Sequence, residues 1–247
     1  HVLLEATKAA FEIRDKHVCD PEQMDISAER LLETNNLRRM ASEIDLKQAK
    51  PWKPKIDLGD TVWMGAADSD GCVVSFIQSI YWEFGSGLVL PETGIVWQNR
   101  GVSFSLDERH HNCLEPMRKP FHTIQPAMAK LRDGRIMAYG TMGGEGQPQT
   151  QAALFSRYAV YQQDLQTAIN APRWLLGKTW GDDSNMLRLE SRIEADVVNE
   201  LKQRGHVVEV VGSYDDIMGH AGAVVVRPDG IFEAASDPRS DGAATGF

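Results

Sequence analysis

The sequence has 247 residues, of which 42% are hydrophobic and 25% charged, and its formal net charge is −9. This is ordinary globular composition with enough apolar residues for a sizeable core. The acidic balance excludes the basic footprint of a protein that binds nucleic acid or an anionic membrane, and no apolar run approaches the roughly 20 residues of a membrane span. The cysteines, Cys19, Cys72 and Cys113, lie too far apart in sequence to suggest a disulfide framework or a metal cluster.

The sequence begins inside a helical pattern. Its first residue is His1 rather than Met, and apolar residues then recur at helical spacing over residues 2–17. We therefore expect the numbering to start part-way through a longer natural chain, with any signal peptide upstream of it. A cytoplasmic location is expected, and periplasmic or secreted locations stay open.

Short helices and a linker are expected next. Ser27 is typical of an N-cap for a helix through Glu33, and Asn36 for another helix through about Lys47. From Lys50 to Leu58, two prolines and alternating charges predict an exposed, poorly helical linker. A self-cleaving junction belongs in such a segment, and so does an ordinary loop.

The run that starts at Thr61 predicts a β-hairpin. Val62–Ala67 is a short apolar strand, Asp68–Gly71 has turn chemistry, and Cys72–Ile80 is a second β-branched and aromatic run. If the bond between Asp60 and Thr61 is cut, Thr61 gains a free α-amine beside its own hydroxyl, so that one residue supplies both nucleophile and base. Most threonines at strand starts are structural, so this pattern alone assigns no function.

The remaining chain alternates strands and helices. Leu88–Trp97 predicts an apolar strand region broken by a turn, and Ser105–Lys119 predicts a solvated loop. In that loop His110 and His111 would point apart in extended chain, and no second ligand pair lies at zinc spacing. Further elements are expected at Ala127–Leu131 and Arg135–Tyr139 (a hairpin), Pro148–Gln163 and Leu165–Ile169 (helices), Leu187–Ile193 (a strand), Ala195–Arg204 (a helix), and Val207–Val211, Ala221–Val226 and Ile231–Ala235 (strands). This order favours an α+β fold with antiparallel sheet covered by helices.

Six spaced blocks carry a resemblance to a known family. They are GDTVWMGAADSDG, SFIQSIYWEFGSGLVLPETGIVWQNRGVSFS, RKPFHTIQPAM, YGTMGGEGQPQTQ, NAPRW and AASDPRSDG. In this order, the chain from His1 to Phe247 resembles the gamma-glutamyltranspeptidase family. The resemblance implies the four-layer αββα sandwich of N-terminal-nucleophile hydrolases, of which this chain would be an N-terminally truncated part. Residues 1–60 would be the C-terminal tail of a large subunit with its maturation linker, and residues 61–247 the small catalytic subunit.

The resemblance assigns catalytic roles. Asp60–Thr61 would be the cleavage site and Thr61 the nucleophile. Ser79 falls where the family places a hydroxyl that hydrogen-bonds the nucleophile; the alternative is a strand hydroxyl paired to backbone. Gly143 and Gly144 match a pair whose N–H groups face the tetrahedral intermediate, and glycine suits this role because backbone approaches a substrate closely only without a side chain. These glycines match neither a P-loop nor a dinucleotide fingerprint, so a nucleotide site is not indicated.

The expected acyl pocket departs from gamma-glutamyl specificity. The family's Asn twenty positions after the nucleophile is replaced by Tyr81, the acid that holds an α-amino group by Ser103, and the pair that contacts an α-carboxylate by His122 and Thr123. Arg100 adds a bidentate donor for a carboxylate. We therefore hypothesise a substrate whose acyl end is anionic but lacks an α-ammonium group. The chain resembles most a branch of the family that contains oxamate amidohydrolase, with cephalosporin-acylase-like members nearby.

The leading expectation is an autoprocessed amidohydrolase without metal or organic cofactor. Its partners would be a small-molecule amide and the large subunit of the same precursor, with neither nucleic acid nor membrane. The competing functions are those of a gamma-glutamyltransferase or glutathione hydrolase, and of a catalytically silent member that acts as a binding or structural module.

Several polar residues near these positions also admit different roles. Arg100 could form an ion pair with Glu83 or Glu92, and these two acids are formally a glycosidase pair. Catalysis by a Ser-His-Asp triad lacks a GxSxG elbow, and His122 has no evident orienting partner. The terminal segment Ala235–Arg239 is expected to be structural and to close loops near the site.

Overall fold

The computed structural model describes residues 1–52, 60–177 and 185–247, so the greater part of the expected linker Lys50–Leu58 lies outside the described residues. The first elements are α1 (Val2–His17), η1 (Pro21–Gln23), α2 (Ala28–Leu31) and α3 (Thr34–Ser42). Ser27 caps α2 as predicted, because its Oγ accepts a hydrogen bond from the Arg30 N–H at 3.3 Å. The predicted cap at Asn36 is wrong: α3 begins before it, and the Asn36 side chain donates to the Leu31 carbonyl at 2.8 Å.

The predicted hairpin is formed by β1 (Asp60–Ala67) and β2 (Val73–Tyr81), which pair antiparallel. The turn between them needs a glycine, since Gly71 has a φ of +86°. The outer face of the hairpin is apolar and exposed, with side chains that alternate as a two-residue period requires. These exposed side chains are Val62, Met64, Val74 and Phe76.

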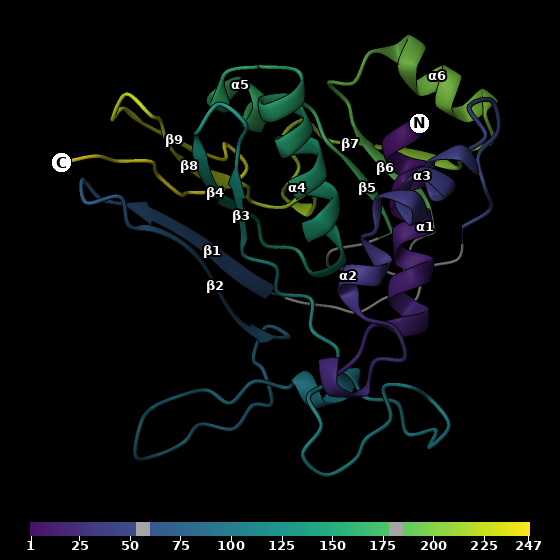
Figure 1. The fold of residues 1–247 in the computed structure, drawn as a ribbon, viewed down its shortest axis with the longest axis vertical. Coiled ribbons are helices and arrows are strands. Elements are labelled where there is room, and N and C mark those ends of the chain that lie inside the picture. Colours follow the sequence, from purple (N-terminus) through teal and green to yellow (C-terminus); the bar gives the residue numbers. More distant parts are fainter. Residues whose placement is uncertain (53–59, 178–184) are drawn as a thin grey trace.

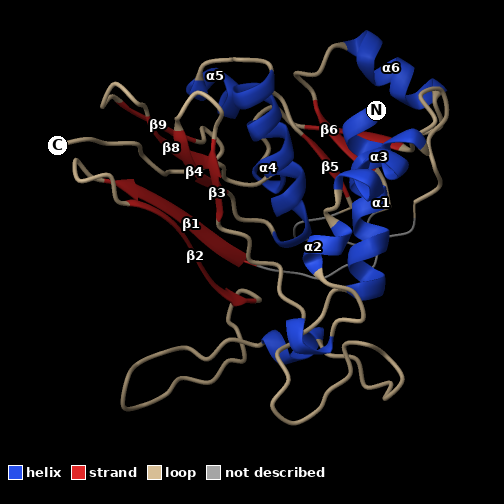
Figure 2. Ribbon diagram, in the orientation of Figure 1, coloured by secondary structure: helices blue, strands red, loops and turns tan. Residues whose placement is uncertain are grey.

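A second sheet lies against the inner face of this hairpin. It consists of β3 (Ala127–Lys130), β4 (Ile136–Gly140), β8 (Gly222–Val226) and β9 (Phe232–Ser236), all antiparallel, in the order β3-β4-β8-β9. Helices α4 (Gln147–Phe155) and α5 (Leu165–Asn170) cover its other face, as Figure 2 shows. The main core lies between these helices and the sheet and includes Met137, Leu154, Ile169 and Val225. The described chain thus stacks helices, a sheet and a hairpin in layers.

The helix expected to reach Gln163 is shorter. Helix α4 ends at Phe155 and continues as one π-helical turn, η4 (Ser156–Val160). The other predicted helix of this region, α5, agrees with the sequence pattern, and the Asp164 side chain caps it by accepting from the Thr167 N–H at 2.9 Å.

A third, smaller sheet contains a parallel pair, which the expectation of antiparallel pairing missed. Its strands are β5 (Trp174–Leu176), β6 (Leu187–Glu190) and β7 (Val208–Val211), with β6 and β7 parallel. The connection between them includes the crossover helix α6 (Ala195–Gln203), and parallel strands need such a long connection. The core of this part includes Leu4 of α1 together with Leu176, Leu187, Leu189, Val198 and Leu201.

Long loops connect β2 to β3 and project away from the sheets (Figure 1). The segment predicted as apolar strand at Leu88–Trp97 forms no regular strand: its halves pair around the predicted turn through an isolated bridge between Val89 and Val96, and both side chains are exposed. After this arm comes the 3-10 turn η2 (Arg100–Ser103), and a similar turn, η5 (Asp216–Met218), precedes β8. Among the residues that the structure describes, no helix combines the length and the apolar character that a membrane span requires.

Candidate active site

Thr61 is the second residue of β1 and lies at a β-bulge. The pairing register with β2 shifts between Asp60 and Val62, so that Thr61 alone lies across from Ser79 and Ile80. Bulges re-aim side chains and are common beside active sites. Thr61 is 9% exposed, and β1 runs through the bond between Asp60 and Thr61, so the strand describes the uncleaved chain.

Several predicted binding residues meet around the guanidinium of Arg100. Its Nη1 donates to Thr123 Oγ1 at 2.8 Å and its Nη2 donates to Ser79 Oγ at 3.3 Å. Its Cζ lies 4.1 Å from the centre of the Tyr81 ring, in cation–π contact. Arg100 and Thr123 are each 3% exposed. The end of β2, the turn η2 and the segment before β3 therefore build one buried cationic cluster.

The alternative considered for Ser79, a strand hydroxyl paired to backbone, has a counterpart in this cluster. Its Oγ accepts a hydrogen bond from the backbone N–H of Tyr81 at 2.9 Å as well as from Arg100. The hydroxyls of Ser79 and Thr123 thus accept hydrogen bonds from two N–H groups of Arg100. Glu83 and Glu92, considered as ion-pair partners for Arg100, are both exposed.

Tyr81 has an unusual backbone conformation. Its φ is +79°, which is strained for a bulky residue, and such strain costs about 1–3 kcal/mol and gathers at functional sites. Asparagine, expected here from the family pattern, tolerates this region far better than tyrosine does. Tyr81 therefore adopts a costly conformation, which places its buried ring against Arg100.

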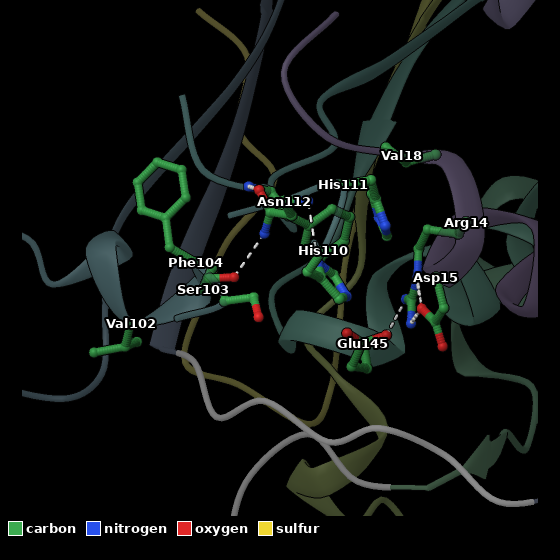
Figure 3. A pocket seen from close by; sticks show the side chains of 12 residues that line it. Arg14, Asp15, Val18, Val102, Ser103, Phe104, His110, His111, Asn112 and Glu145 are labelled. Atoms are coloured by element: carbon green, nitrogen blue, oxygen red, sulfur yellow. Dashed lines mark hydrogen bonds and ion pairs between the residues drawn. The ribbon is translucent and has the colours of Figure 1, made fainter. Parts of the chain in front are cut away.

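The other two predicted binding residues lie differently. His122 is exposed, and its Nδ1 accepts the Ile124 N–H at 3.2 Å. Partial burial of its ring, and then the charge of Arg100, lower the pKa of His122, so the imidazole is neutral near pH 7. Ser103 is half-buried and lines a cavity of about 280 Å³, which Figure 3 shows. Its hydroxyl has no hydrogen-bond partner within the described ranges.

The same cavity corrects the expectation for His110 and His111. Their rings stack with centres 4.3 Å apart and line the cavity, instead of pointing apart into solvent. The reason is that the chain turns at these residues, since the Cys113 N–H donates to the His110 carbonyl at 2.9 Å. An extended backbone, on which the expectation depended, does not occur here.

Gly143 and Gly144 form a buried loop between β4 and α4. Their φ values are +112° and +47°, in the left-handed region that glycine adopts without strain. The loop closes through the turn η3 (Gly144–Gly146), in which the Gly146 N–H donates to the Gly143 carbonyl at 2.7 Å. Met142, which directly precedes Gly143, lines a groove of about 450 Å³ that Thr61 also lines. The paired glycines therefore directly follow a wall residue of the groove that contains Thr61.

A buried ionic network that the sequence analysis missed lies behind this loop. Arg173 Nη2 lies 2.5 Å from Asp237 Oδ2, and Arg239 makes two contacts of 2.7 Å with the carboxylate of Glu190. All of these side chains are buried. The signal in the sequence is an arginine directly after proline in two of the six blocks, NAPRW and AASDPRSDG.

This network reaches the glycine loop through Gly219. Arg173 Nη1 donates to the Gly219 carbonyl at 2.8 Å. A Cβ at Gly219 would lie 2.7 Å from Thr141 Oγ1 and 3.0 Å from the Met142 carbonyl oxygen. The expectation that the segment Ala235–Arg239 closes loops near the site agrees with these contacts.

One group in the described part of the chain has the chemistry of a metal site. Ligand atoms of His1, Glu5 and His206 lie within 4.8 Å of one another, far from β1 (Figure 1). The Lys8 ammonium, however, lies 2.7 Å from the Glu5 carboxylate. Burial, followed by the Lys8 charge, lowers the pKa of His206 to about 4. The Lys8 ammonium therefore already neutralises the Glu5 carboxylate, and it would repel a metal cation bound beside it.

Comparison with known proteins agrees with the resemblance seen in the sequence. The family model described as Gamma-glutamyltranspeptidase matches residues 1–247. The oxamate amidohydrolase proenzyme of Klebsiella pneumoniae is 54% identical over all of this chain and 47% of its own length. The glutathione hydrolase-like YwrD proenzyme of Bacillus subtilis is 47% identical over all of this chain and 47% of its own length.

Solved structures show the same likeness. The crystal structure of cephalosporin acylase from Bacillus halodurans matches with a TM-score of 0.81 at 33% identity, over 99% of this chain and 45% of that chain. The mixed α+β fold of the N-terminal-nucleophile hydrolase type is thereby confirmed. The chain spans about half the length of the curated relatives it matches.

Proposed function

The chain belongs to the gamma-glutamyltranspeptidase family, and we propose that it forms the core of an autoprocessed amide hydrolase whose nucleophile is Thr61. The favoured substrate is a small anionic amide such as oxamate. The observation that carries this proposal is the buried Arg100, whose Nη2 lies 3.3 Å from Oγ of Ser79, one of the two residues across the bulge from Thr61. Because Arg100 lies beside Ser79, across the strand pair from Thr61, its guanidinium could bind a substrate carboxylate adjacent to the carbonyl that Thr61 attacks.

The length of the acyl group favours oxamate over a γ-glutamyl compound. In oxamate the carboxylate is bonded directly to the amide carbon, so a carboxylate held by Arg100 keeps the carbonyl close to Thr61. A γ-glutamyl group places its carboxylate several carbons away and carries an ammonium that needs an acidic partner. Ser103, which stands where the family has that acid, cannot supply the charge. The relative with 54% identity is named an oxamate amidohydrolase.

The proposed mechanism gives Thr61 and the paired glycines distinct roles. Cleavage of the bond between Asp60 and Thr61 frees the α-amine, which takes the proton from the Thr61 hydroxyl as its oxygen attacks the amide carbon. The N–H groups of Gly143 and Gly144 stabilise the oxyanion, and one such donor is worth about 2.7–4 kcal/mol at the transition state. The α-amine passes the proton to the leaving ammonia, and water then hydrolyses the ester and restores Thr61.

The proposed partner is the other part of the same precursor. A cut before Thr61 leaves residues 1–60 and 61–247 as separate chains, held together by contacts such as that of Asp20 Oδ2 with the Lys119 N–H at 2.8 Å. Both curated relatives described above are named proenzymes, which supports processing of this kind. The exposed apolar side chains of β1 and β2 offer a surface for a further part of a longer precursor.

The test compares two substrates on the full-length protein that contains this chain. We expect a higher kcat/KM for oxamate than for γ-glutamyl-p-nitroanilide, and faster γ-glutamyl turnover would refute the proposed pocket in favour of a glutathione hydrolase. Thr61→Ala should abolish both processing and turnover, whereas Thr61→Ser, which keeps a hydroxyl, should retain part of each. Mass spectrometry should find a new N-terminus at Thr61. A chain that stays intact would identify a silent binding or structural module.

A further inference from the structure

The loop Gly143–Gly146 has the sequence Gly-Gly-Glu-Gly, so Glu145 is its only side chain. Glycines in the left-handed region have no side chains to pack, and their conformational freedom is otherwise large. The position of the loop must therefore come from its backbone contacts and from Glu145. The Glu145 carbonyl accepts a hydrogen bond from Gln149 Nε2 at 3.1 Å, which holds the backbone on one side.

The side chain of Glu145 is held by Arg14 of α1. Glu145 is 7% exposed, and its Oε2 accepts a hydrogen bond from Arg14 Nη1 in an ion pair that Figure 3 draws as a dashed line. Arg14 is itself fixed, because its Nε and Nη2 donate to Asp15 Oδ1 at 2.8 and 2.6 Å. A planar guanidinium that is already held through two of its N–H groups loses little further freedom when another N–H group binds a second carboxylate.

Arg14 also makes cation–π contacts with two aromatic rings. Its Cζ lies 4.1 Å from the centre of the Phe11 ring and 5.4 Å from that of the Phe121 ring. Phe121 directly precedes His122 and Thr123 of the predicted acyl pocket. One arginine thus contacts both the glycine loop and the segment that leads into the Arg100 cluster.

We propose that Arg14 is a positioning residue for the oxyanion-binding glycines. Through Glu145 it fixes the N–H groups of Gly143 and Gly144 relative to the groove of Thr61. It does so from the part of the precursor that precedes the cleavage site, so the segment before the cut contributes to the chemistry after it. This inference rests on the proposed function, because it assigns the glycines their role in amide hydrolysis.

The expected effect is on turnover rather than on substrate binding. Backbone N–H donors that act on the oxyanion stabilise the transition state more than the ground state, so their displacement lowers kcat and leaves KM nearly unchanged. A misplacement of about an ångström can cost roughly 100-fold in rate. For Arg14→Met and for Glu145→Gln we expect kcat to fall by roughly 10- to 100-fold, with KM within about twofold of the original value.

The experiment measures kcat and KM for oxamate on the full-length protein, per cleaved Thr61 terminus counted by mass spectrometry. Arg14→Lys keeps a cation near Glu145 and should regain part of the lost kcat, which a merely structural role would not predict. The matched control is Arg39→Met, since Arg39 pairs with Glu43 on the surface of α3 at 2.7 Å and both side chains are 61% exposed. The control should keep the original kcat and KM.

The outcomes separate this inference from the proposed function. If the original protein hydrolyses oxamate and Arg14→Met and Glu145→Gln keep kcat within twofold, the positioning role is wrong while the function stands. A loss that appears in KM alone overturns it as well. If Arg14→Met does not mature, the positioning role is judged from kcat and KM of Glu145→Gln and Arg14→Lys. An original protein that cleaves no amide would instead refute the proposed function.

Discussion

Replacing Gly140 with alanine should displace the hairpin that carries Thr61. Trp63, two residues beyond Thr61, lays its indole against Gly140 of β4 and Gly222 of β8, which are paired in the sheet. A Cβ on Gly140 would lie 2.1 Å from Trp63 Cδ1, and one on Gly222 would lie 2.4 Å from Cζ3. The indole N–H donates to Ser75 Oγ at 3.0 Å, which fixes the orientation of the ring. Alanine at Gly140 therefore forces the ring, and the strand with it, away from the sheet.

The size of the destabilisation can be worked out from the distances between the new Cβ and the Trp63 indole. Carbon atoms in contact lie about 3.5–4.0 Å apart, so a rigid ring must retreat by more than an ångström to admit the new Cβ. Overpacking of this kind costs about 1–3 kcal/mol, and we expect the upper end because the three nearest atoms belong to one ring. For a protein of this size about 1 kcal/mol shifts Tm by about 2–4 °C, so a cost of about 3 kcal/mol gives a fall of roughly 6–12 °C. Turnover should fall by roughly tenfold, because Thr61 moves with Trp63.

Thermal melts followed by circular dichroism test this prediction. Gly246→Ala is the control, since a Cβ at that position would meet nothing within 4 Å. In a Trp63→Leu background, where the clashing ring is absent, Gly140→Ala should cost much less than it does in the original protein, so the two changes should be non-additive. An equal loss of Tm in both backgrounds, or a loss no larger than that of the control, would refute the reasoning.

Three further predictions concern charged groups. Arg100→Met should raise KM for oxamate far more than KM for a neutral amide, and an equal rise for both would contradict carboxylate binding. Asp237→Asn leaves Arg173 without its buried partner and should cost about 3–5 kcal/mol of stability, seen as a lower Tm; an unchanged Tm would count against the network. Burial and the Lys8 charge lower the pKa of His206 from 6.5 to about 4. Within that range the unfolded chain binds a proton that the folded chain does not, so Tm should fall as the pH drops from 6.5 to 4, and His206→Gln should weaken that fall.

The elements that the sequence predicted well are those specified by local chemistry. Both hairpins have turn residues at fixed offsets between apolar runs, and the glycines Gly71 and Gly134 take φ values of +86° and +89° as such turns require. Helix α1 has the predicted bounds, Val2–His17, because its apolar spacing is regular. The helix expected at Ala195–Arg204 forms as α6, and Gly205, which follows its last turn, has a φ of +96°.

The features that were missed depend on residues far apart in sequence. Strand β5 has only three residues, too few for a periodic pattern, and it forms because β6 pairs with it. The arm Leu88–Trp97 is apolar and its two halves are joined by backbone hydrogen bonds between Leu88 and Trp97 and between Leu90 and Ile95, but it forms only an isolated bridge and joins no sheet. For Arg100 the sequence left open a carboxylate or a ligand as partner. Thr123, which lies 23 residues further along the chain, supplies a hydroxyl partner, and only the fold shows this.

Cleavage before Thr61 would change the chemistry of the site far more than its architecture. Leu4 of α1 packs in one core with Leu176 and Leu187, which lie well beyond the cut. The ion pair of Arg14 with Glu145 likewise joins the two sides of the cut. Because these contacts need no peptide bond at Thr61, we expect a cleaved chain to keep the same packing and to gain one α-amine. On the proposed mechanism, the glycine loop and the groove would therefore exist before the amine that makes the nearby hydroxyl a nucleophile, and processing would serve as the switch between the two states.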